Sequence, residues 1–154
     1  MESAEHRAPD GARRTRRSPE HWGVLAFAGL TLVVLLVLGL FLSPDPSGVG
    51  THEQLGMRAC MTMDRWNVPC PGCGVTTSVT LATQGRLLDS FLNQPFGFAV
   101  ALAMVGFVLW AGVGHLRRRD LYDDLRALPA ARWSIAIGVV AALSWVYKIW
   151  LVRH

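Results

Sequence analysis

The sequence predicts an all-α, polytopic membrane protein with three transmembrane helices and short amphipathic helices at the outer membrane interface. Apolar residues make up 51% of the 154 residues, yet the charged residues are crowded into a few short stretches. Three runs of 20 residues or more separate these stretches and carry one charge between them. Each run is long enough to cross a hydrocarbon core of roughly 30 Å.

The apolar runs also define the predicted organisation of the chain. A basic leader (1–21) precedes the first span (22–43). An outer cysteine-bearing loop (44–94) leads to the second span (95–114), and a basic loop (115–132) leads to the third span (133–152). The first run is longer than the roughly 7–15 apolar residues of a cleaved signal peptide, and no small-residue cleavage site follows it. Lys148 lies near the end of the third run, where we expect its ammonium to reach the headgroups along its own stem.

The arginines predict the orientation of the spans. The leader and the 115–132 loop carry five arginines each, whereas the longer 44–94 loop carries three. Because basic residues near span ends mark the cytoplasmic side, we expect a multi-pass protein of the cell membrane with its amino terminus in the cytoplasm. All three cysteines then lie outside, where a disulfide can persist. The net charge of +4 comes mainly from arginines that set the orientation of the spans in the membrane. We therefore expect no nucleic-acid partner.

The chain after the cysteines has a helical pattern. Apolar residues at helical spacing from Val75 and from Leu88 predict two short helices that divide at Gly85. Neither helix is long enough to span a membrane, so we expect both to lie in the outer interface. Asn93-Gln94-Pro95 ends the second helix and opens the second span, because proline at the first helical position loses no hydrogen bond.

The best candidates for a chemical role are the cysteines of the stretch Cys70-Pro-Gly-Cys73. Cys73 precedes a helix start, where free backbone amides favour a thiolate. Three interpretations stay open: a disulfide staple or inert thiols, a redox pair of Cys70 and Cys73, and a metal site. In the metal site, with zinc as a possible ion, Cys60 and His52 join the pair as ligands. Any disulfide leaves one of the three cysteines unpaired.

The stretch VPCPGCGVTTSVTLATQGRLLDSFLNQPFGF, with a cysteine upstream, resembles a family of small bacterial membrane proteins of unknown function (DUF2752). Its members carry CPxCGxTR, then a glycine, then Asn-Pro before a transmembrane helix. The matching positions are Cys70, Pro71, Cys73, Gly74, Thr76, Gly85 and Pro95. Thr77 and Gln94 stand where arginine and asparagine are usual. The resemblance implies a bacterial inner or plasma membrane and a role for the cysteines, and it implies no activity.

We therefore expect a non-enzymatic membrane module whose outer loop is closed by a cysteine staple or a metal clip. The alternative is a thiol–disulfide or metal-handling protein that works through Cys70 and Cys73. The sequence contains no phosphate-binding loop, no Ser-His-Asp set and no HExxH motif. Expected partners are the lipid bilayer and either another membrane protein or a second copy of the chain.

Overall fold

The computed structural model describes residues 19–126 and 129–153, and the arginines of the leader lie outside these residues. Three long helices, each long and apolar enough to cross a membrane, dominate the fold: α1 (Pro19–Phe41), α5 (Pro95–Leu116) and α7 (Ala130–Arg153). The shorter elements are the 3-10 helix η2 (Thr51–Leu55) and the α-helices α2 (Met61–Trp66), α3 (Val75–Thr83), α4 (Leu87–Asn93) and α6 (Leu121–Arg126). The described residues form no strand. The predicted all-α fold with three membrane-length helices is confirmed.

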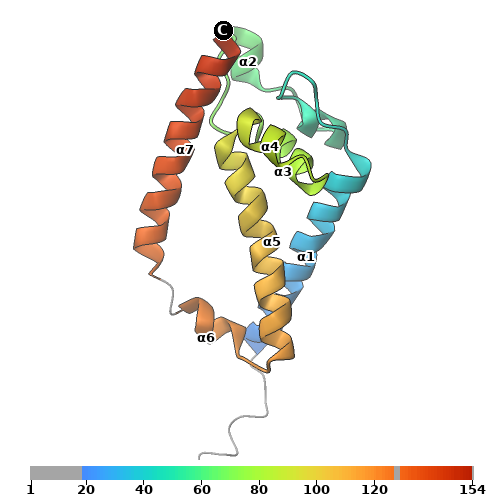
Figure 1. Ribbon diagram of the computed structural model, residues 1–154, viewed down its shortest axis with the longest axis vertical. Coiled ribbons are helices and arrows are strands. Elements are labelled where there is room, and N and C mark those ends of the chain that lie inside the picture. Colours follow the sequence, from blue (N-terminus) through green and yellow to red (C-terminus); the bar gives the residue numbers. More distant parts are fainter. Residues whose placement is uncertain (1–18, 127–128, 154) are drawn as a thin grey trace, which may run out of the picture.

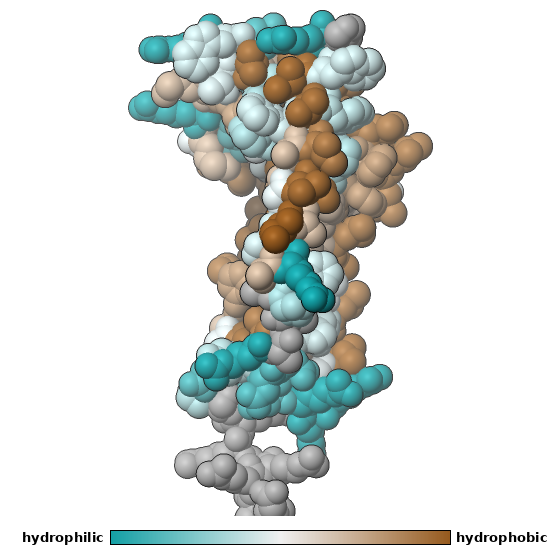
Figure 2. Space-filling model, turned by 90° about the vertical axis from the view of Figure 1, so that its left-hand side faces the viewer, coloured by the Kyte–Doolittle hydropathy of each residue, from teal (hydrophilic) through white to brown (hydrophobic). Residues whose placement is uncertain are grey.

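Hydrophilic residues gather at the two ends of the molecule, and mainly hydrophobic residues line the side between them (Figure 2). Most large apolar side chains of the three long helices are exposed, as Leu40 at 73% and Ile135 at 69% illustrate. An exposed apolar surface of this extent needs a cover, and the hydrocarbon core of a bilayer supplies one. The end that carries residues 44–94 is called the cysteine end below.

At the cysteine end, α3 and α4 form a helical hairpin beside the ends of α1 and α5 (Figure 1). Gly85, with a φ of +81°, divides the two helices as predicted. Ser78 and Ser90 close the hairpin, because each hydroxyl donates to the other residue's backbone carbonyl, at 3.1 and 2.7 Å. Val79 of α3 packs in a buried apolar cluster with residues of α1 and α5.

Two glycines let α3 approach the long helices closely. A Cβ added at Gly97 of α5 would lie 2.7 Å from the Cβ of Ser78. One added at Gly39 of α1 would lie 3.2 Å from the Cβ of Thr83. Small residues at such crossings allow helix backbones to come together in a membrane, where apolar burial alone gives little preference for one arrangement.

α7 stands away from the other long helices over its first half (Figure 1), where all side chains of residues 131–140 are exposed. Its second half is attached by hydrogen bonds. The hydroxyl of Ser144 accepts from the amide of Phe96 at 3.0 Å. The hydroxyl of Tyr147 donates to the carbonyl of Leu92 at 2.7 Å. Polar contacts at the cysteine end therefore position α7.

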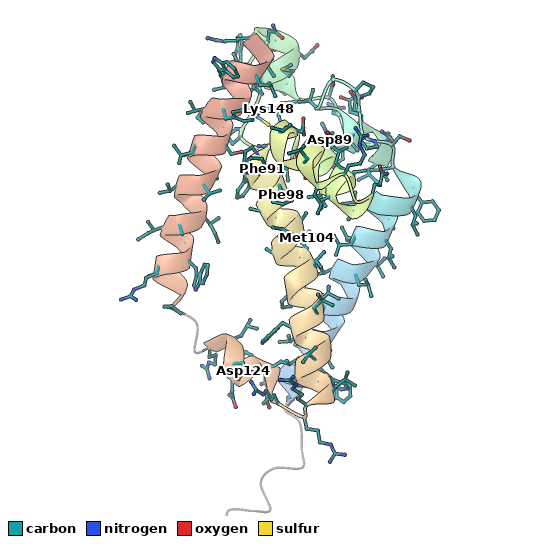
Figure 3. All side chains as sticks on the ribbon, viewed as in Figure 1. Asp89, Phe91, Phe98, Met104, Asp124 and Lys148 are labelled. Carbon is teal, nitrogen blue, oxygen red and sulfur yellow. The ribbon has the colours of Figure 1, made fainter. Side chains whose placement is uncertain are left out.

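Lys148 lies inside the molecule, so the expectation that it reaches the headgroups is wrong. Only 1% of this residue is exposed. It extends from α7 toward the junction of α4 and α5 (Figure 3), where Gly48 and Asn93 supply oxygen acceptors. Oxygen acceptors around a buried ammonium accept the hydrogen bonds that water would accept at the surface, and they stabilise the ammonium in this way.

We predict that Gly97→Ala lowers the free energy of unfolding by about 1–3 kcal/mol, because the new methyl group would overlap Ser78 and push α3 away from α5. Gly106→Ala is the matched control, since nothing lies within 4 Å of its Cβ position in the same helix. Titration with SDS in mixed micelles, followed by circular dichroism, measures both values. Equal stability of the two variants would contradict the close packing of α3 on α5.

Candidate metal centre

A tight turn brings the first pair of thiols together. The amide of Cys73 donates to the carbonyl of Cys70 at 3.0 Å, and the amide of Cys70 donates to the Sγ of Cys73 at 3.2 Å. The two sulfurs lie 3.1 Å apart, and both are free thiols. Gly74, with a φ of +88°, follows the turn and leads into α3. The left-handed conformation at that position favours glycine.

Cys60, at the start of α2, completes a cluster with this pair. The three sulfurs all lie within 4.8 Å of one another. Two thiolates on one tetrahedral zinc ion, each at about 2.3 Å from the metal, lie about 3.8 Å apart. Small side-chain movements therefore suffice for Cys60, Cys70 and Cys73 to bind one ion. Sequence spacing suggested these three residues as ligands, and the fold brings them to one place.

His52, the fourth ligand suggested by the sequence, is not part of this group. Its Nε2 lies 3.2 Å from the carbonyl oxygen of Arg58. With Cys60, Met63 and Asp64, it lines a hollow of about 170 Å³. The structure therefore brings three protein ligands together among the described residues. The fourth ligand of a bound ion would be a group in this hollow or a water molecule.

Side chains from α7 and from the α4–α5 junction hold the cysteine turn. The indole Nε1 of Trp145 donates to the carbonyl of Pro69 at 2.8 Å. The carboxamide of Gln94 donates to the carbonyl of Pro71 at 3.2 Å. The residues immediately before and within the turn are therefore fixed from two directions. Sequence reasoning did not identify either side chain as part of the site.

Asn93 and Lys148 hold the other side of the turn. The Nδ2 of Asn93 donates to the carbonyl of Gly74 at 3.1 Å, and its Oδ1 accepts from the Nζ of Lys148 at 2.8 Å. The same Nζ donates to the carbonyls of Gly48 and Asn93 at 3.1 and 3.3 Å. Sequence reasoning missed both residues as part of the site, and the signal in the sequence was a lysine in an otherwise uncharged run.

The thiols differ in acidity. Burial raises the pKa of Cys73 above the usual range of a thiol, and its hydrogen bonds with Cys70 and Cys60 add to this effect. The expectation that the helix start makes Cys73 the stabilised thiolate is therefore wrong. Burial also acts to raise the pKa of Cys60, but hydrogen bonds, above all from Thr62 at 3.1 Å, outweigh it and lower the pKa to about 6. Of these two thiols, Cys60 is therefore the one whose surroundings favour the thiolate.

The fold and the site together define an integral membrane protein of three long helices with a three-thiol cluster beside the ends of its spans. Residues 60–109 match the family described as "Protein of unknown function (DUF2752)", and over this segment the chain is similar to that family. The matched segment contains all three cysteines, α3, α4 and most of α5. The family resemblance noted in the sequence is thereby confirmed. Comparisons with curated proteins and with solved structures gave no match.

We predict that iodoacetamide modifies Cys60 first and Cys73 last in the reduced, metal-free protein. The rate at Cys60 should be half-maximal near pH 6, because its thiolate persists above its lowered pKa and is protonated below it. Mass spectrometry of peptides from short labelling pulses at a series of pH values measures the rates. Thr62→Val should move the profile of Cys60 to higher pH, since the hydroxyl that supports the thiolate is removed. An ordinary thiol profile for Cys60 in the unmodified chain would contradict this assignment.

Proposed function

We propose that the protein is a non-enzymatic membrane module whose loop is clipped by one metal ion, zinc being the candidate, bound by Cys60, Cys70 and Cys73. The convergence of the three sulfurs within 4.8 Å carries this proposal. A disulfide joins two sulfurs and leaves the third unused, whereas a zinc ion uses three or four ligands. The donor set of thiols also suits zinc among the common divalent ions.

The segment that would be clipped has little packing of its own. α2 has no buried residue, and its Met61 and Trp66 are 70% and 68% exposed. Burial of apolar surface therefore contributes little to holding α2 in place. A metal ion would tie Cys60 at the start of α2 to Cys73 at the start of α3, and metal–thiolate bonds would supply the stabilisation that packing does not.

The distribution of arginines supports an outer location for the cluster and a cytoplasmic amino terminus in a bacterial inner or plasma membrane. In that orientation the loop meets metal ions supplied from outside the cell. The exposed apolar sides of α1, α5 and α7 are suited to lipid. They also offer surface for a membrane-protein partner or a second copy of the chain.

One contact favours a second candidate, thiol–disulfide exchange. The sulfurs of Cys70 and Cys73 lie 3.1 Å apart. In an exchange with a partner disulfide, these two thiols would lose two electrons and two protons and form one S–S bond. The partner would gain them and become two thiols. The thiolate of Cys60, within 4.8 Å of both sulfurs, is close enough to attack the new bond.

We predict that the reduced full-length protein binds one Zn²⁺ or Co²⁺ ion, and that Cys60→Ser, Cys70→Ser and Cys73→Ser each weaken binding about 100-fold or more, because each removes a ligand. Competition with a chromophoric chelator measures the affinity. The thiolate-to-cobalt charge-transfer absorption reports the number of sulfur ligands. Met63→Leu is the control, since it changes the same hollow and keeps all three thiols.

Two outcomes would decide against the metal clip. One is a wild-type protein that takes up no ion at micromolar Zn²⁺. The other is a reversible disulfide in the native protein that disappears in Cys70→Ser and Cys73→Ser and remains in Cys60→Ser. The second result would establish the exchange chemistry instead.

A further inference from the structure

We infer that Lys148 is the fixed counter-charge of the three-thiolate site and that it makes this site specific for a divalent ion. The inference rests on the proposed metal clip and adds the charge class of the ion. Lys148 is not a ligand. It acts on the site from α7 as a positioning residue, through its charge and through its contacts with Asn93 and Gly48.

The contacts of Lys148 are those of a charged ammonium. Its Nζ is within 3.3 Å of three oxygens, namely the carbonyl of Gly48 and the carbonyl and Oδ1 of Asn93. An ammonium has three N–H groups and can donate one to each oxygen. A neutral amine has two N–H groups and would turn its lone pair toward the third oxygen. The geometry therefore fits a positive charge that is 1% exposed.

This charge has no carboxylate partner in the part of the chain that the structure describes, where Arg86 and Asp89 form the ion pair observed. A buried charge without an opposite charge is costly. The thiol cluster can supply that opposite charge. A Cβ added at Gly74, the residue after Cys73, would lie 3.2 Å from the Nζ of Lys148. A thiolate at Cys73 would attract an ammonium this close by their opposite charges.

The balance of charges then selects the ion. Three thiolates and a divalent ion carry one net negative charge, which a single ammonium cancels. Three thiolates and a monovalent ion carry two negative charges, and one of them stays uncompensated. A half-buried site favours the neutral sum, because every uncompensated charge has lost part of its hydration. The site therefore takes a thiophilic divalent ion such as Zn²⁺ with three sulfurs, and Cu⁺ with only two.

The same charge couples the ion to the position of α7. The cysteine-end half of α7 already holds the turn through the bond from Trp145 to Pro69. Binding of the ion requires Cys73 to lose its proton, which places negative charge beside Gly74 and therefore closer to Lys148, and this strengthens the attachment. By reciprocity, the attached α7 strengthens binding of the ion by the same factor.

The test compares Zn²⁺ affinities of full-length variants in one detergent at one pH. Lys148→Gln keeps two N–H donors and removes the charge, whereas Lys148→Arg keeps the charge. Val146→Ala is the matched control, because this neighbouring side chain of α7 is 63% exposed and its truncation leaves the charge and the bonds that attach α7 in place. We expect Lys148→Gln to lower the affinity about 10- to 100-fold. Lys148→Arg and Val146→Ala should stay close to wild type.

Wild-type affinity in a folded Lys148→Gln variant would overturn the counter-charge and leave the metal clip intact. Failure of the wild type to bind Zn²⁺ would instead overturn the metal clip. X-ray absorption on the wild-type protein gives an independent test that does not require any variant to fold. Three sulfur ligands to Zn²⁺ and two to Cu⁺ are expected, and three sulfur ligands to Cu⁺ would overturn the charge balance.

Discussion

The carboxamide of Asn93 links three parts of the molecule that lie far apart in the sequence. Its Nδ2 donates to the carbonyl of Gly74 and to the hydroxyl of Ser78, and its Oδ1 accepts from Lys148. One side chain thus fixes the start of α3, the end of α4 and the second half of α7 relative to one another. Because Gly74 follows Cys73, the geometry of the thiol cluster depends on this set of hydrogen bonds.

Polar contacts have this importance because the protein is built for a membrane. Apolar side chains gain little from choosing another helix over lipid, so close backbone approach and hydrogen bonds select the arrangement of the spans. Gly97 and Gly39 provide the close approach, and the paired hydroxyls of Ser78 and Ser90 provide buried hydrogen bonds. The bonds from Ser144 and Tyr147 do the same for α7. These contacts of α3, α4 and α7 all lie at the cysteine end.

The sequence predicted the features that depend on local pattern. Apolar runs gave the long helices, and Gly85 gave the division between α3 and α4. The site depends on contacts that no local pattern reveals. Lys148 was expected at the headgroups because its stem is long enough, but its acceptors are residues 55 and 100 positions away in the chain. The acidity of Cys73 was misjudged for a related reason, since burial by the fold outweighs the helix start.

The position of the cluster determines what a bound ion can influence. The turn is held by Gln94 at the start of α5 and by Trp145 of α7, and the cluster lies at the start of α3. Tightening the three sulfurs around an ion therefore acts on two long helices at once, and not on the loop alone. α7 is the span most open to this influence, because residues 131–140 are exposed throughout and its anchoring contacts lie at the cysteine end. A clip that stabilises α2 against α3 would, through Lys148, also stabilise the placement of α7.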